Sequence, residues 1–111
     1  MAYLGEFEQL ILFSLVELGD EAYGVAIRES IEARTGRVAS AGSIYTTLAR
    51  LADKGFVSAS AGVPIPGRAG RPRKHYVILP EGAKALNASF TRMQAMSGGL
   101  LDRLASLSEE G

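Results

Sequence analysis

The stretch "ASAGSIYTTLARLADKGFVSASAG", residues 39–62, changes from a helical to an alternating hydrophobic pattern. This change from helix to strand is the main indication of the fold. In its first part the apolar positions recur at steps of four and three residues: Ile44, Leu48 and Leu51. This spacing predicts an amphipathic helix over residues 39–55, with Ser40 as its N-cap and Gly55 at its end. The next segment, residues 56–62, alternates in polarity and ends at a glycine, which predicts a strand.

A second strand is predicted downstream, over "RKHYVIL", residues 73–79. The connecting segment "VPIPGRAGRP", residues 63–72, contains three prolines and two glycines. This composition predicts a loop. The two strands form a hairpin with a long basic tip. Because two strands alone are only marginally stable, we expect the hairpin to lean on the helices.

Two further helices are predicted upstream of the quoted stretch. Apolar residues recur at three- and four-residue steps over residues 4–18, and Gly19 follows where a C-terminal cap belongs. A second helix spans residues 22–35 and is stopped by Gly36.

The last helix opens at Pro80 and carries a heptad-like seam. The seam steps by four and three residues: Leu86, Phe90, Met93, Ser97, Leu100, Leu104 and Leu107. Gly98-Gly99 is a point at which such a helix kinks or breaks. The seam either packs on the chain's own core or pairs with a second copy. A small monomer has few faces to cover so much apolar surface, so we expect a homodimer held by these residues: Leu86, Phe90, Met93, Leu100 and Leu104.

The predicted fold class is mainly α with a two-stranded β-hairpin. Three short helices followed by a basic hairpin make a winged helix-turn-helix, in which the third helix is the recognition helix and the hairpin is the wing. We expect this DNA-binding domain over residues 1–80 and a C-terminal dimerisation helix over residues 81–111.

Composition excludes several classes of protein. The 111 residues include no cysteine, which rules out disulfides, thiolate nucleophiles and cysteine-bound zinc and fits a cytoplasmic location. No apolar run approaches the roughly 20 residues that a membrane span needs, and no signal peptide is recognisable. A Walker-type loop is absent, and His75 is the single histidine. We therefore expect neither an enzyme nor a cofactor, and we interpret His75 as a packing or hydrogen-bonding residue at the base of the wing.

The formal net charge is zero, but the charges are unevenly distributed. Residues 1–33 hold seven acids and one base, whereas residues 34–75 hold eight bases and one acid. Such a basic block is typical of a site for a polyanion, although a solvated basic face would have the same composition.

Three segments together resemble the PadR-type transcriptional regulators. They are "LGEFEQLILFSLVELGDEAYGVAIRESIEARTG" (residues 4–36), "SAGSIYTTLARLADKGFV" (residues 40–57) and "GRAGRPRKHYVILPEG" (residues 67–82). The resemblance implies a winged-helix DNA-binding domain, a homodimer held largely by the C-terminal helix, and a transcription factor that is usually a repressor and is sometimes released by a small-molecule effector. A single C-terminal helix resembles the short subfamily and leaves little material for an effector pocket.

The expected DNA contacts fall into two groups. Short polar side chains on the third helix can approach base edges in the major groove, and Gly42 leaves room for the helix N-terminus to near a phosphate. The resemblance implies a backbone contact by Tyr45. This group comprises Ser40, Gly42, Ser43, Tyr45, Thr46, Thr47 and Arg50. The wing group is expected on phosphates or in the minor groove: Arg68, Arg71, Arg73 and Lys74.

Each group also has a simpler interpretation. The third helix could present an ordinary solvated polar face, and the basic loop could be a solubilising linker. The runner-up function is a winged-helix module that binds an acidic protein partner through the wing. Such a module would bind every DNA sequence weakly, whereas a sequence-specific regulator of double-stranded DNA would prefer one.

Overall fold

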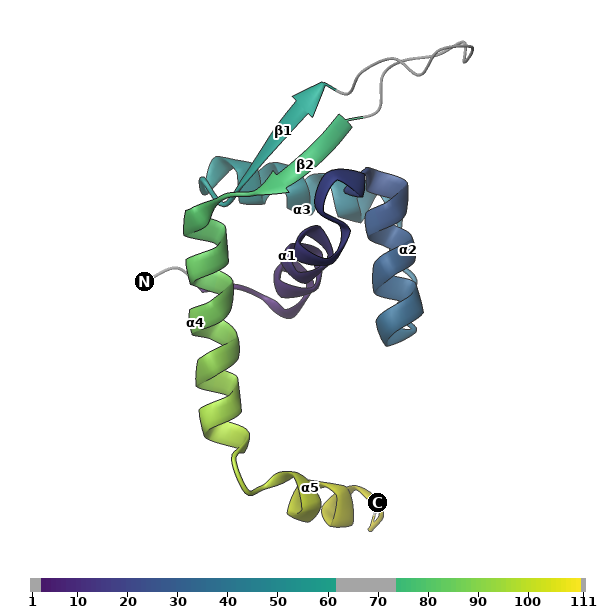
Figure 1. Cartoon of the computed structure of the whole chain (residues 1–111). Coiled ribbons are helices and arrows are strands. Elements are labelled where there is room, and N and C mark those ends of the chain that lie inside the picture. Colours follow the sequence, from purple (N-terminus) through teal and green to yellow (C-terminus); the bar gives the residue numbers. More distant parts are fainter. Residues whose placement is uncertain (1–2, 62–73, 111) are drawn as a thin grey trace.

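The computed structural model describes residues 3–61 and 74–110. Three helices come first, then an antiparallel hairpin, then two more helices (Figure 1). The elements are α1 (Glu6–Leu18), η1 (Gly19–Glu21), α2 (Gly24–Thr35), α3 (Ala41–Asp53), β1 (Val57–Ala61), β2 (Lys74–Ile78), α4 (Pro80–Ser97) and α5 (Leu101–Ser108). The predicted fold class, mainly α with a two-stranded hairpin, is confirmed.

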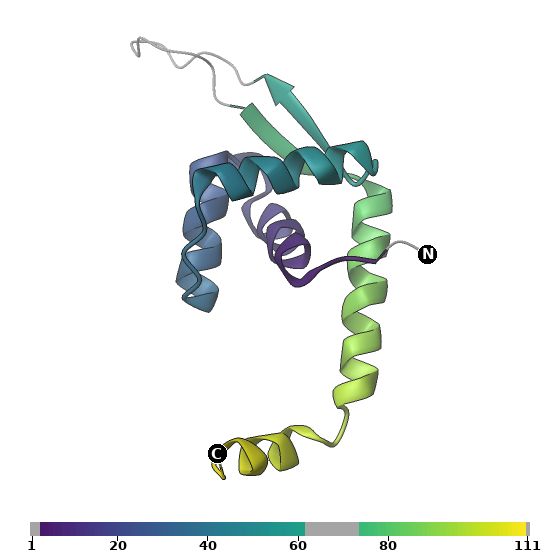
Figure 2. The same ribbon diagram turned by 180° about the vertical axis from the view of Figure 1, so that it is seen from behind.

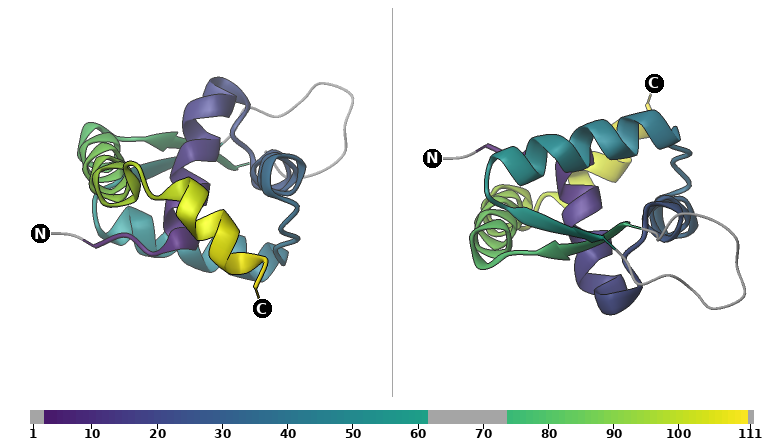
Figure 3. Two further views of the ribbon diagram at one scale, coloured as in Figure 1. Left: turned by 90° about the horizontal axis from the view of Figure 1, so that it is seen from below. Right: turned by 90° about the horizontal axis from the view of Figure 1, so that it is seen from above.

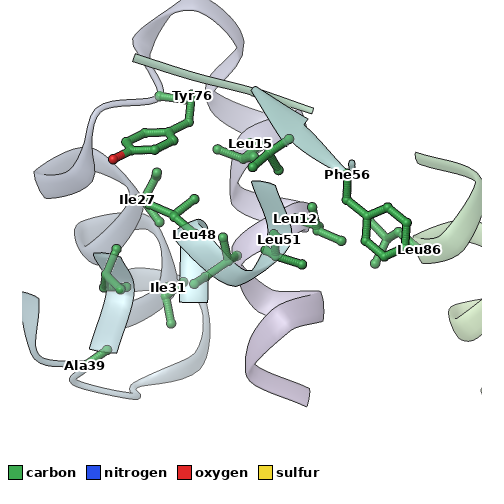
Figure 4. Close-up of a cluster of buried hydrophobic side chains, with 14 residues drawn as sticks. Leu12, Leu15, Ile27, Ile31, Ala39, Leu48, Leu51, Phe56, Tyr76 and Leu86 are labelled. Carbon is green, nitrogen blue, oxygen red and sulfur yellow. The ribbon is translucent and has the colours of Figure 1, made fainter. Parts of the chain in front are cut away.

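The core lies where α1 crosses between α2, α3 and the hairpin (Figure 4). Each helix contributes apolar side chains at helical spacing, and burying one such side chain is worth about 1.5–3 kcal/mol. The fully buried members with the largest side chains are Ile11, Leu12, Ile27, Ile44, Leu48 and Leu51. The apolar stripes that predicted the helices are therefore the surfaces that hold them together.

The hairpin is anchored at its inner strand. β1 and β2 pair antiparallel, from Val57 opposite Ile78 to Ala61 opposite Lys74. The Tyr76 amide also donates a hydrogen bond to the Ala22 carbonyl, 3.0 Å away, so β2 is held against the segment that leads into α2. The hairpin thus leans on the helices, as its size requires.

His75 lies at this anchor. Its Nδ1 is 3.4 Å from Ser60 Oγ, and its Nε2 is 3.4 Å from the Gly19 carbonyl oxygen. Its ring also lies against Tyr23, with 5.9 Å between ring centroids. The packing and hydrogen-bonding role expected for His75 at the base of the wing agrees with these contacts. In residues 3–61 and 74–110, no three His, Cys, Asp or Glu side chains cluster as a metal site would require.

The C-terminal helix breaks at Gly98-Gly99, the point named from the sequence as one where such a helix kinks or breaks. Gly99 has a positive φ of 76°, and the chain turns there between α4 and α5. α4 extends beyond the three-helix core and α5 turns back beneath it (Figure 2). The radius of gyration is consequently 16.6 Å, against about 13 Å for a compact chain of this length.

Candidate nucleic-acid interface

The start of α3 presents a polar surface. Ser40 caps the helix, because its Oγ accepts a hydrogen bond from the Ser43 amide at 3.1 Å. The side chains of Ser43, Thr46 and Arg50 are exposed, and so is Gly42. These residues, which were expected to contact DNA, therefore share the solvent-facing side of α3.

Thr47 is a correction to that group. We expected it on the exposed face, but it is only 6% exposed and lies among the buried positions of α3. The reason is helical geometry: Thr47 comes three residues after Ile44 and four before Leu51, so it falls on the same face as both. Thr47 is thus positioned to pack, and we leave it out of the set proposed to contact DNA.

The wing starts directly from the end of α3. Gly55, with φ of 79°, reverses the chain, and the Phe56 amide then donates a hydrogen bond to the Leu51 carbonyl at 3.0 Å. The hairpin therefore lies beside α3 (Figure 3). Lys74 is exposed at the start of β2, whereas Arg68, Arg71 and Arg73 lie outside the residues that the structure describes.

Sequence reasoning missed a contact between α2 and α3. Gly24, the first residue of α2, lies against the phenol of Tyr45: a Cβ at this position would be 2.4 Å from Tyr45 Oη. Tyr45 itself is 48% exposed. The "AYG" tripeptide at residues 22–24 was noticed only as part of the family resemblance, and no periodicity could have paired it with Tyr45.

Tyr76 of β2 was missed as well. Burial raises the pKa of its phenol, and the neighbouring Tyr45 raises it further. Both phenols line one pocket between α2, α3 and the hairpin. The Tyr76 hydroxyl is protonated at neutral pH, as in any tyrosine, and can donate a hydrogen bond.

The expected dimerisation seam divides into two parts. Leu86 is a correction: at 5% exposure it belongs to the core of its own chain. Phe90 packs edge-on against Phe13 of α1, with 5.6 Å between ring centroids, and is still 43% exposed. Met93, Leu100 and Leu104 are exposed by 63%, 52% and 62%. The seam thus leaves the core after Leu86 because α4 extends past it.

A family comparison agrees with this geometry. The model of the transcriptional regulator PadR-like family matches residues 11–88, which include the second part of α1, the helices α2 and α3, both strands of the hairpin and the first half of α4. The chain belongs to the PadR-like family. Members of this family are transcriptional regulators, so this PadR-like protein is a DNA-binding regulator and not an enzyme.

Solved structures show the same fold for the PadR-like protein. RosR of H. salinarum is 26% identical, with a TM-score of 0.66 over 96% of this chain and 88% of RosR. A PadR family transcription regulator from Clostridium difficile is 23% identical, with a TM-score of 0.72 over 90% of this chain and 99% of that one. A winged-helix DNA-binding protein from STIV is 18% identical, with a TM-score of 0.69 over 88% and 98% of the two chains. The last two likenesses concern the fold alone.

No curated protein matches the PadR-like chain in sequence. Across the helices of residues 3–61 and 74–110, none has the length and apolar character needed to cross a membrane.

Proposed function

We propose that this PadR-like protein is a homodimeric repressor that binds a pseudo-palindromic operator. The recognition helix α3 enters the major groove, and the basic wing contacts phosphates or the minor groove. One observation carries the proposal: the exposed polar start of α3 lies beside a hairpin whose end carries Lys74. The α3 residues proposed to contact DNA are Ser40, Gly42, Ser43, Tyr45, Thr46 and Arg50, and the wing residues are Arg68, Arg71, Arg73 and Lys74.

The apolar surface of α4 and α5 supports the homodimer. No residue of α5 is buried, although this helix carries Leu101, Leu104 and Leu107, exposed by 64%, 62% and 44%. Contiguous exposed apolar surface of this kind marks an interaction site in a monomer. A second copy would cover it and would place two α3 helices on successive major grooves, about 34–36 Å apart.

DNA binding is tested by fluorescence anisotropy. A labelled duplex from the protein's own upstream region and a scrambled duplex of equal length are titrated at several salt concentrations. We expect tight binding to the first, much weaker binding to the second and a steep loss with salt, with a slope of about 0.9 per phosphate neutralised. If no native upstream duplex and no duplex from a genome-wide selection binds better than the scramble, the repressor is wrong and a module for an acidic protein partner is favoured.

Two variants separate the roles of wing and helix. Arg71→Ala should weaken binding to all duplexes and reduce the salt slope by about one. Thr46→Ala should instead reduce the preference for the operator, because it removes a group that faces the base edges. Equal effects of both variants on both duplexes would contradict this division of roles.

The homodimer is tested by light scattering after gel filtration. Leu104→Glu places a charge in the exposed apolar face without disturbing the core, since Leu104 is 62% exposed. We expect this variant to be monomeric at concentrations where the wild type is dimeric. Ser106→Glu, at an exposed position of the same helix, is the matched control and should remain dimeric. A monomeric wild type, or a dimeric Leu104→Glu variant, would contradict the proposed interface.

A further inference from the structure

Thr46 lies at the centre of the uncovered face of α3. It comes two residues after Ile44 and two before Leu48, each only 1% exposed, so about 200° of helix rotation separates its side chain from either one. Its side chain is accordingly exposed. Figure 2 shows α3 in front, with no other described element crossing it. Thr46 is therefore the part of α3 that a surface approaching from outside meets first.

The side chains around Thr46 are small. Its neighbours on the helix surface, three and four residues away, are Gly42, Ser43, Ala49 and Arg50, and all four are exposed. Three of these neighbours carry at most a hydroxymethyl group, and only Arg50 is long. A partner can therefore come close to the helix backbone on the side of Thr46 that leads to the helix start.

The fold itself does not require glycine at position 42. The φ of Gly42 is not positive, and a Cβ there would meet no described atom within 4 Å. Alanine would also be the better helix former. Neither backbone conformation nor packing within the chain accounts for the missing side chain. A partner that approaches to within the reach of a Cβ does account for it.

This face has few free polar groups with which to read hydrogen bonds. The Ser43 hydroxyl belongs to the cap, because it donates to the Ser40 carbonyl at 2.9 Å and accepts from Ser40 Oγ at 3.0 Å. Gly42 and Ala49 have no polar side-chain atom. Thr46 offers one hydroxyl and one methyl group. Recognition at the centre of this face therefore depends on apolar contact as well as on hydrogen bonds.

An apolar group is available in the major groove at one base. Thymine presents its C5-methyl group there, and the methyl groups of threonine and alanine contact it. We propose that Thr46 is a specificity-determining residue that reads a thymine through this methyl group, and that Gly42 lets the base edge approach the helix. The proposal rests on the major-groove binding proposed above and names the chemical group that is read. Each half-site then contains an A·T pair opposite Thr46.

Asp53 limits the part of α3 that enters the groove. It is exposed and lies seven residues after Thr46, on the same side of the helix and about 10 Å further along its axis. Its carboxylate is repelled by phosphates. The reading part is therefore residues 42–50, about 12 Å long, which matches three to four base pairs at about 3.4 Å each. One thymine within so short a site is a large share of what α3 can read.

The first test removes the methyl group from the DNA. In the operator identified by the titrations above, each thymine in turn is replaced by deoxyuridine, which lacks only the C5-methyl group. At one position in each half-site we expect a loss of affinity of about fourfold, the value for burying one group of this size. The same replacements in the scrambled duplex should have no effect.

Two variants remove the matching groups from the protein. Thr46→Ser keeps the hydroxyl and loses the methyl group, whereas Thr46→Val keeps a methyl group and loses the hydroxyl. Thr46→Ser should bind the thymine and deoxyuridine operators equally well, because one partner of the contact is already missing. Thr46→Val should keep the fourfold preference for thymine. Both changes are at an exposed position, and circular dichroism checks that both variants fold.

Gly42→Ala tests the close approach. The added methyl group meets nothing in the protein, so the variant should fold normally, yet it should bind the operator about tenfold more weakly because the groove has no room for it. A variant that binds the operator as tightly as the wild type would contradict the close approach.

The outcomes distinguish the reading of thymine from the function. If the wild type prefers no duplex over the scramble, the proposed operator binding itself fails. If it prefers an operator that lacks thymine, or binds every deoxyuridine operator as tightly as the thymine form, the reading of thymine alone is wrong. If one position responds but Thr46→Ser responds as strongly as the wild type, another side chain reads the methyl group and the assignment to Thr46 is overturned.

Discussion

Replacing Gly82 with alanine should destabilise the protein, although alanine is the better helix former. Gly82 lies in the first turn of α4, and a Cβ there would be 2.3 Å from the carbonyl oxygen of Phe56. Reaching even a 3.0 Å contact requires a shift of about 0.7 Å, and both sides of the contact are backbone. That carbonyl also accepts a hydrogen bond from the Leu79 amide at 2.8 Å, which the shift would lengthen.

The magnitude follows from two opposing effects. Overpacking costs about 1–3 kcal/mol, and replacing glycine in a helix gains up to about 1 kcal/mol. We expect a net loss of about 1–2 kcal/mol for Gly82→Ala, which lowers the Tm by roughly 5–15 °C in a domain of this size. Because both sides of the contact are backbone, small structural adjustments should recover little of this loss in stability.

Gly42→Ala is the matched control. Gly42 also lies in the first turn of a helix, α3, but a Cβ there meets nothing within 4 Å. This variant should be as stable as the wild type or more stable, by up to about 1 kcal/mol. Both Tm values are measured by circular dichroism at one protein concentration, because the proposed dimer would make the Tm depend on concentration. A Tm of Gly82→Ala at or above that of the wild type would refute the reasoning.

Three further predictions concern other parts of the fold. Ser40→Ala removes the N-cap of α3 and should cost about 1 kcal/mol in urea denaturation; an unchanged midpoint would show that the cap contributes nothing. Glu8 is largely buried, which raises its pKa, but its hydrogen bonds with Lys54 and the Gly5 amide lower the pKa overall. Its contribution to stability is therefore complete at neutral pH and is lost as acid takes the pH below the ordinary pKa of glutamate. Glu8→Gln should flatten this acid dependence of the free energy of unfolding, and an equally steep decline would contradict it. Thr47→Val should leave the preference for the operator unchanged in anisotropy titrations, because Thr47 is buried; a loss as large as that of Thr46→Ala would contradict its placement in the core.

The sequence predicted the regular elements well because their signals are local. The third helix was expected over residues 39–55 and spans Ala41–Asp53, and its cap at Ser40 was expected from the residue type. Thr47 was misplaced although its position relative to Ile44 and Leu51 already carried the information. The prediction relied on the polar side chain of Thr47, whereas its helical spacing from Ile44 and Leu51 correctly indicated a buried position.

Other features depend on contacts between distant segments. Leu86 and Leu104 share one seam in the sequence, yet one is in the core and the other is exposed, because only the first part of α4 lies on α1. The contact between Gly24 of α2 and Tyr45 of α3 joins two residues that are 21 positions apart in the sequence. No local pattern predicts either feature, since both depend on how the helices cross.

The proposed recognition helix and the proposed dimer face are connected through the backbone of one residue, Phe56. The Phe56 amide donates to the Leu51 carbonyl near the end of α3, and the Phe56 carbonyl accepts from the Leu79 amide just before α4. Gly82 then packs directly against that carbonyl. The recognition helix and the helix that carries the apolar face are therefore joined through backbone contacts, which side-chain motion cannot loosen. In a dimer formed through α4 and α5, the separation of the two α3 helices would depend on this junction, and a repressor that reads two half-sites at a set spacing needs such a rigid connection.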